Sequence, residues 1–377
     1  MPSPVQTFAV IGLGFGDEGK GSVVDLLTRL HGAKLVVRFN GGCQAGHNVV
    51  TSSGVHHCFS QFGSGALAGA ATHLGPGMLV EPFALLRESD ILRTKTGCDP
   101  LELLTIDPEC VITTPYHEKA NQLRELRRGV GRHGSCGRGI GETRADELDG
   151  LALRVKDLGT PTARGILREI QHRRDWEFYG HQHMSPEEMA DHYGDVRQQL
   201  QFGSFKEALA QNVGPVIFEG AQGVLLDQKH GFAPHNSWTD CTFRNAEKML
   251  EGMPVTKIGV LRAYATRHGA GPFPSEDKSL SFPEFHNMHG QWQGCFRLGH
   301  FDHARVIYAL DAVGGIDELA INHLDRFPNG EFTLLNVEGF VTTVHKGPVE
   351  AIEQDILGMP IKYASYGPTA EDKRILY

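Results

Sequence analysis

The sequence lacks the features that mark secreted and membrane proteins. Its seven cysteines are widely scattered and form no C-x-x-C pair, which indicates reduced thiols rather than a disulfide framework or a zinc site. No apolar run approaches the roughly 18 residues that a membrane span needs, and residues 1–7 carry no positive segment typical of a signal peptide. We therefore expect a soluble, cytoplasmic protein that binds no membrane.

An excess of positive charge is also missing. The 45 acidic and 36 basic residues give a formal net charge of −9, which argues against a general electrostatic grip on nucleic acid. An anionic ligand would therefore need a local positive patch. The 377 residues show no internal repeat, low-complexity tract or convincing linker, so we expect a single domain over residues 1–377.

The N-terminal hydrophobic pattern predicts a parallel α/β unit. An apolar run at Phe8–Leu13 has strand length, Gly19–Leu30 has helical spacing, and Leu35–Phe39 is a second buried-strand candidate. The six glycines of Gly129–Gly141 predict a loop. Further strands are expected at Val216–Glu219, Lys257–Thr266, Glu318–Asn322 and Phe332–Val344, and further helices at Pro161–Arg174, Glu187–Gln211 and His303–Ala312. We expect an α/β fold in which helices and inserted loops flank a mostly parallel central sheet.

The segment Gly14–Gly21, between the first strand and the first helix, predicts a phosphate-binding loop. Its glycines fit both G-x-G-x-x-G and G-x-x-x-x-G-K, and Lys20 favours the second pattern because a cation beside helix N-terminal amides holds phosphates. Gly21 stands where a P-loop has the Ser or Thr that binds magnesium, and Asp17 adds an unexpected acid. A dinucleotide-binding turn of an oxidoreductase and a plain glycine-rich turn are the alternatives.

A second glycine-rich loop, Asn40–Asn48, follows the second strand. Loops at the carboxyl ends of neighbouring parallel strands share one crevice, so His47 is expected near Asp17 and the phosphates. A histidine there could act as a general acid or stabilise charge on a transferring phosphate.

These loops resemble the paired signature of the adenylosuccinate synthetase family. The resemblance rests on Gly16–Gly21, on Gly41-Gly42 and on Ala45-Gly46-His47. Matches to further family motifs follow in the same order at Ser135–Gly141, Phe218–Asp227, Thr266–Glu276, Asn322–Asp325 and Ser365–Pro368, so the similarity spans Val10 to Pro368. It implies the P-loop-like nucleotide-binding fold of that family and a homodimer.

The resemblance also implies a reaction in two steps. Family members transfer the γ-phosphoryl group of GTP to O6 of IMP, and the amine of L-aspartate then displaces phosphate at C6. Asp17 would take the N1 proton, with Lys20 and His47 as the other catalytic residues. Asp17 and the Gly46 carbonyl would hold Mg²⁺.

The resemblance assigns binding residues to three ligands. Those for the triphosphate are Glu18, Gly19, Lys20, Gly21, Gly46, His47, Asn48, Asp325, Ser365, Gly367 and Pro368. Those for the purine monophosphate are Asp17, Gln44, Ser135, Cys136, Gln222, Ser237 and Arg267. Those for the amino acid are Arg297 and Gly294.

Departures from the family pattern leave the substrates open. Only Arg297 remains of the arginine-rich loop that grips aspartate, and the segment that sends an arginine across the dimer has none here. Gln44 and Cys136 replace other residues near the acceptor, and His323 replaces a lysine near the guanine pocket. The acceptor could thus be IMP or dGMP, and the donor GTP, ATP or dATP. A ligase for a different amine or purine analogue and a non-catalytic nucleotide-binding protein are the alternatives.

Overall fold

The computed structural model describes residues 5–178, 181–284, 286–287, 290–327, 331–338, 341–348 and 361–376. Among these residues a nine-stranded sheet has the order β18-β17-β14-β10-β1-β9-β2-β5-β7, in which β18 is antiparallel to β17 and the other neighbours run parallel. Its strands are β1 (Thr7–Gly12), β2 (Leu35–Arg38), β5 (Ala71–Leu74), β7 (Leu104–Ile106), β9 (Val216–Gly223), β10 (Thr256–Arg262), β14 (Glu318–Asn322), β17 (Ile361–Ser365) and β18 (Lys373–Ile375). The expected α/β fold is confirmed.

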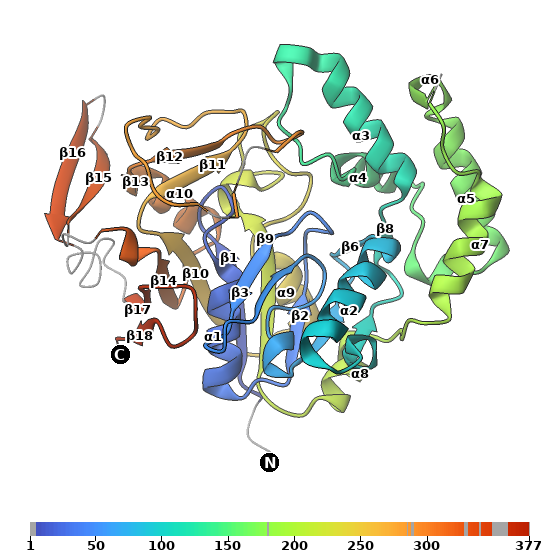
Figure 1. The fold of residues 1–377 in the computed structure, drawn as a ribbon, viewed down its shortest axis with the longest axis horizontal. Coiled ribbons are helices and arrows are strands. Elements are labelled where there is room, and N and C mark those ends of the chain that lie inside the picture. Colours follow the sequence, from blue (N-terminus) through green and yellow to red (C-terminus); the bar gives the residue numbers. More distant parts are fainter. Residues whose placement is uncertain are drawn as a thin grey trace.

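Helices flank this sheet, and the other described strands form small two- and three-stranded sheets (Figure 1). The helices are α1 (Lys20–His31), α2 (Pro82–Thr96), α3 (Pro115–Arg128), α4 (Ile140–Leu148), α5 (Pro161–His172), α6 (Asp175–Phe178), α7 (Pro186–Arg197), α8 (Phe205–Gln211), α9 (Arg244–Leu250) and α10 (His303–Ala312). The remaining strands are β3 (His47–Val50), β4 (His56–Phe59), β6 (Leu79–Val80), β8 (Val111–Ile112), β11 (Ala265–His268), β12 (Phe296–Gly299), β13 (Phe301–Asp302), β15 (Glu331–Glu338) and β16 (Val341–Pro348).

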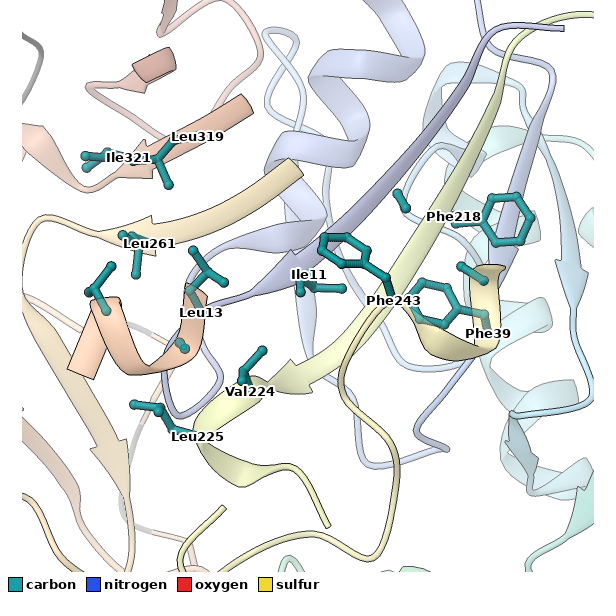
Figure 2. Close-up of a cluster of buried hydrophobic side chains, with 14 of the residues drawn as sticks. Ile11, Leu13, Phe39, Phe218, Val224, Leu225, Phe243, Leu261, Leu319 and Ile321 are labelled. Atoms are coloured by element: carbon teal, nitrogen blue, oxygen red, sulfur yellow. The ribbon is translucent and has the colours of Figure 1, made fainter. Parts of the chain in front are cut away.

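Both faces of the central sheet are buried, as a parallel sheet requires. Ala9 and Ile11 of β1 join one core with residues of β9, β10, β14, α9 and α10, and Figure 2 shows part of this cluster. The alternate residues Phe8 and Val10 pack with α1 on the opposite face. A separate core joins α2, α3, α5 and α7, the helices that Figure 1 places to the right of the sheet. The single-domain organisation stays a prediction.

The predicted elements near the N-terminus agree with β1, α1 and β2, and the expected strand Glu318–Asn322 and helix His303–Ala312 are observed with these bounds. Most of Gly129–Gly141 is a loop, as expected, although α4 begins at Ile140.

Three longer predictions are wrong because the chain turns inside each of them. The expected helix Glu187–Gln211 is two helices, α7 and α8, since Ser204 and Glu207 form a capping box that begins α8. The expected strand Lys257–Thr266 divides into β10 and β11, which belong to different sheets. The expected strand Phe332–Val344 is the antiparallel pair β15–β16, and residues 339–340 between them lie outside the described part.

Candidate active site

The loop between β1 and α1 is organised by the side chain of Glu18. One carboxylate oxygen, Oε1, accepts hydrogen bonds from the amides of Gly14 and Gly16 at 3.0 and 2.8 Å. The other, Oε2, pairs with Lys20 Nζ at 2.7 Å, and both side chains are buried. A Cβ at Gly12 would lie 2.1 Å from Glu18 Oε2, so this position requires glycine. Glu18 therefore holds the loop from inside.

Asp17 projects from the same loop in a strained but well-supported conformation. Its φ of 60° lies in the left-handed region, which is unusual for a residue other than glycine. Arg262 Nε donates to the Asp17 carbonyl at 2.5 Å, and His268 Nδ1 lies 3.6 Å from Asp17 Oδ2. Burial alone would raise the pKa of Asp17, but the His268 contact and the charges of Arg262 and Lys20 outweigh it and lower that pKa. Asp17 is thus a carboxylate at neutral pH, the form that accepts a proton.

His47 follows the second glycine-rich loop and is fixed by an acid on the central sheet. Its Nδ1 lies 2.6 Å from Glu219 Oε1. Since a carboxylate only accepts hydrogen bonds, Nδ1 carries a proton and Nε2 remains for a ligand. Burial lowers the pKa of His47 despite the opposing effect of Glu219. Glu219 also accepts from the amide and hydroxyl of Ser64, and its own pKa is held at about 2.

The close approach of His47 explains the missing P-loop hydroxyl. A Cβ at Gly21 would lie 2.8 Å from the His47 Cβ and 2.9 Å from Ser64 Oγ, closer than such atoms approach. A Ser or Thr at position 21 would therefore displace the histidine.

One cavity of about 860 Å³ joins the two loops. Asp17 and His47 both line it, so the structure places them in one crevice, as the sequence predicts. The other predicted site residues on its lining are Gly19, Lys20, Gly21, Gln44, Gly46, Asn48, Ser135, Cys136, Gln222, Ser237, Arg267, Asp325, Ser365, Gly367 and Pro368.

Two further loop clusters complete the lining. At one, Ser135 Oγ donates to Asn121 Oδ1 at 3.1 Å, and Ser237 Oγ lies 2.8 Å from the Thr239 hydroxyl. Burial raises the pKa of Cys136 to about 11, so its thiol stays uncharged. At the other, Ser365 Oγ bonds the Gly367 carbonyl at 2.9 Å. These clusters thus add neutral polar groups to the cavity lining.

Comparisons with known proteins show the family of the chain. A model of the adenylosuccinate synthetase family matches residues 9–333. An adenylosuccinate synthetase of Bordetella avium is 34% identical over 431 residues, which cover 98% of each chain. The chain belongs to the adenylosuccinate synthetase family. Family members are NTP-dependent carbon–nitrogen ligases, and this protein is an enzyme of that class.

Solved structures of the synthetases share the fold. The fully ligated adenylosuccinate synthetase from Plasmodium falciparum has a TM-score of 0.83 at 20% identity, with 100% of both chains covered. A cyanophage S-2L succinoaminodeoxyadenylate synthetase (PurZ), bound to dGMP and dATP, has a TM-score of 0.64 at 17% identity and covers 99% of this chain and 95% of its own. Within the described residues, none of the helices has the length and apolar character that a membrane crossing needs.

Three residues that the synthetase resemblance assigned to ligands lie off the cavity lining. Glu18 is turned into its own loop, as described above. Arg297 binds the carbonyls of Gly269 and Gly271 at 3.0 and 2.9 Å and Glu276 at 2.5 Å, and Gly294 is likewise not among the described lining residues. The structure therefore does not bring these residues to the cavity, because their partners lie within the protein.

Arg267 lines the cavity, but its guanidinium is already engaged. It donates to the carbonyls of Ala270, Pro272 and His235 at 3.1, 3.1 and 2.9 Å. Burial lowers the pKa of Arg267 to about 10. We assign its side chain to the stability of the cavity wall, and its contact with a nucleotide stays a prediction.

Several functional positions escaped the sequence reasoning. Glu219 was part of a recognised motif without a role, although an acid within an apolar strand was a usable signal. Arg262 closes β10 in the same way and binds Glu284 at 2.6 Å as well as Asp17. Asn322 donates to the Glu18 carbonyl at 2.7 Å. Arg262 and Asn322 are the last residues of β10 and β14 and support the loop between β1 and α1, whereas Glu219 lies within β9 and supports His47.

Proposed function

We propose that this synthetase phosphorylates O6 of a 6-oxopurine nucleoside monophosphate and then joins L-aspartate at C6, with release of phosphate. The acceptor class comprises IMP and dGMP, and the donor class comprises GTP, ATP and dATP. The observation that carries the proposal is the placement of the ionised Asp17 in the cavity that Lys20 and His47 also line.

The chemistry gives each of these residues a role. The 6-oxo group of a purine is a poor leaving group, so it is first converted to a phosphate ester. Asp17 removes the N1 proton while O6 attacks the γ-phosphorus, and the bond from that phosphorus to the bridging oxygen breaks to release the nucleoside diphosphate. The amine of aspartate then attacks C6 and phosphate leaves. Positioning and charge stabilisation are the main contributions of a protein to such transfers.

Lys20 and His47 supply the electrostatic part. Lys20 begins α1, where the helix dipole and free amides favour phosphate oxygens. Its buried partner Glu18 keeps the ammonium group at the loop. His47 lines the cavity, and Glu219 holds its Nδ1–H and so orients the ring beside the phosphate loop. Proton uptake at Nε2, which the Glu219 carboxylate favours, would make the ring a donor to charge on the transferring group.

Mg²⁺ fits the donor set of this loop. Asp17 has a one-third exposed carboxylate on the cavity, and the Gly46 backbone lines it as well. Magnesium is usually held by one or two carboxylates together with waters and substrate phosphates, so a larger protein cluster is not needed. Asp17 and the Gly46 carbonyl would hold the ion, which neutralises phosphate charge when bound.

The donor base is proposed to lie beside Asp325, Ser365, Gly367 and Pro368, which line the cavity together. A carboxylate can accept both N1–H and N2–H of guanine, which supports GTP. Arg326 Nε lies 3.5 Å from Asp325 Oδ2 and adds a donor that could meet adenine N1 or guanine O6. The assignment of the donor therefore rests on experiment, as do the homodimer and the cytoplasmic location that the family implies.

Phosphate release tests the proposal. IMP, dIMP, GMP and dGMP are each incubated with L-aspartate, Mg²⁺ and GTP, ATP or dATP, and the PurZ structure with dGMP and dATP motivates the deoxy members. We expect release that depends on one acceptor, on aspartate and on an intact Asp17. If the wild-type protein releases no phosphate with any combination, the proposal is wrong.

A further inference from the structure

A histidine outside the predicted site faces the carboxylate of Asp17. His268 lines the cavity, and its Nδ1 lies 3.6 Å from Asp17 Oδ2. This distance allows an ion pair and is slightly longer than a hydrogen bond. A carboxylate accepts hydrogen bonds, so a proton on the facing ring nitrogen is the arrangement that attracts it.

The position of His268 is set by regular structure. It is the last residue of β11, where it pairs with Phe296 of β12 in the antiparallel register. The Phe296 ring packs edge-on against the imidazole, with ring centroids 5.2 Å apart. The next residue, Gly269, donates its amide to the Cys295 carbonyl at 2.9 Å. A strand end that is paired with its neighbour is a firmer support than a loop.

Among the described side chains, His268 is the one that the structure places against the Asp17 carboxylate. Arg262 fixes the Asp17 backbone carbonyl, but the terminal torsion of an aspartate is broad and the carboxylate is 33% exposed. Attraction between His268 and Oδ2 favours one orientation of the carboxylate, in which Oδ1 can accept the purine N1–H and the remaining lone pairs can face Mg²⁺.

We propose that His268 is a positioning residue, which orients the Asp17 carboxylate toward the ring nitrogen of the purine acceptor. This inference rests on the proposed function of Asp17 as the base. It assigns His268 to the phosphorylation step and gives it no part in binding the donor nucleotide.

The test isolates the phosphorylation step by omitting aspartate. Reversible transfer of the γ-phosphoryl group to O6 lets the β-phosphate of the diphosphate rotate, so an ¹⁸O label in the β–γ bridge scrambles to nonbridging positions. The variants are His268→Leu, His268→Asn, whose amide nitrogen can replace Nδ1, and the matched control His300→Leu. His300 Nε2 lies 2.9 Å from Asp277 Oδ2, and the side chains of His300 and Asp277 are 17% and 33% exposed, nearly as those of His268 and Asp17 are. His300 lies outside the described cavity lining.

We expect His268→Leu to slow scrambling and kcat by about 10- to 100-fold with little change in the KM of either nucleotide, as for a misplaced base. His268→Asn should recover most of the loss, and His300→Leu should keep the wild-type rate. In the Asp17→Asn background the His268→Leu change should have no further effect, because His268 acts only through Asp17.

The outcomes separate this inference from the proposed function. Suppose that the wild-type protein scrambles the label. The positioning role is then overturned, and the ligase function stands, if His268→Leu keeps the wild-type rate. The same holds if His268→Leu causes as large a loss in the Asp17→Asn background as in the wild type. A wild-type protein that neither scrambles nor releases phosphate with any acceptor overturns both. Thermal unfolding of each variant shows whether a lost rate reflects a lost fold.

Discussion

Replacing Glu219 with glutamine would remove the buried charge that holds His47. The carboxylate is fully buried and accepts from His47 Nδ1, the Ser64 hydroxyl and the Ser64 amide. The glutamine side chain has an NH₂ group in place of one carboxylate oxygen. This NH₂ group would face at least one of the three donors, to which it cannot form a hydrogen bond as an acceptor. Either the Ser64 amide is left unsatisfied or His47 must change its tautomer.

The size of the effect follows from the pKa of Glu219. Burial opposes ionisation, but His47, Arg38 and Ser64 lower that pKa from 4.5 to about 2. This difference corresponds to about 3 kcal/mol of stability that depends on the ionised form. A depressed carboxylate pKa stabilises the native state above pH 4.5, and this contribution is lost as the pH falls toward 2. The glutamine variant should therefore lose about 3 kcal/mol at neutral pH and show a flatter acid limb.

Activity should fall further than stability because the tautomer of His47 is part of the site. We expect kcat to fall by about 100-fold, the cost of losing one oriented charge-stabilising group. The assays are urea unfolding and phosphate release under conditions where the variant is folded.

A second buried acid provides the control. Glu88 accepts from the amides of Ser60 and Gln61, each at 2.8 Å, and its oxygen lies 3.7 Å from His57 Nε2, off the described cavity lining. Glu88→Gln should lose stability and keep kcat. The reasoning fails if both variants lose activity equally, or if Glu219→Gln turns over at the wild-type rate.

Three other predictions concern separate parts of the molecule. Asp17→Asn should lower kcat by about 1,000-fold because the base is lost, and scrambling of bridge-labelled donor would report the same loss. Asp325→Asn should raise the KM for GTP by about tenfold but not that for ATP, and equal effects on both would remove Asp325 from base recognition. Burial lowers the pKa of His73 from 6.5 to about 4. As the pH falls between these values, the unfolded chain takes up a proton that the native state does not, so the free energy of unfolding should fall by about 3 kcal/mol. His73→Leu should abolish this pH dependence in urea titrations.

The sequence predicts those strands whose hydrophobic pattern matches the burial of their residues in the structure. β1 and β14 are buried on both faces and therefore read as continuous apolar runs. The strands β3, β4 and β5 have four residues each and contain histidines, so no periodicity identifies them. β3 and β4 pair with each other as a local hairpin, and β5 takes its place by pairing with β2 and β7.

Errors in the predicted elements have the same origin. The expected helix Glu187–Gln211 keeps apolar residues at helical spacing, but Ser204 caps a new helix because its hydroxyl and the Glu207 carboxylate satisfy the first amides. Local hydrogen bonding therefore overrides periodicity at this point.

The candidate site was predictable where two consecutive loops supply it. Asp17 follows β1 and His47 follows β2, the two strands of one α/β unit. Loops at the carboxyl ends of parallel strands lie at the same edge of the sheet. Glu219 lies 172 residues from His47, and the contact arises only because β9 separates β1 from β2 in the sheet. Arg297 was assigned by position along the chain, but Glu276 and two carbonyls engage it, which a motif cannot reveal.

The unusual residues of the phosphate loop are consequences of one another. His47 packs so closely on α1 that position 21 admits no side chain, and the hydroxyl that a P-loop offers to magnesium is thereby excluded. An oxygen ligand must then come from elsewhere in the loop, and Asp17 is the described acid that lines the cavity there. A carboxylate so placed can also accept a ring proton, because Arg262, Lys20 and His268 keep it ionised against the cost of burial. The glycine at 21 and the acid at 17 thus follow from placing a histidine against the phosphate-binding helix.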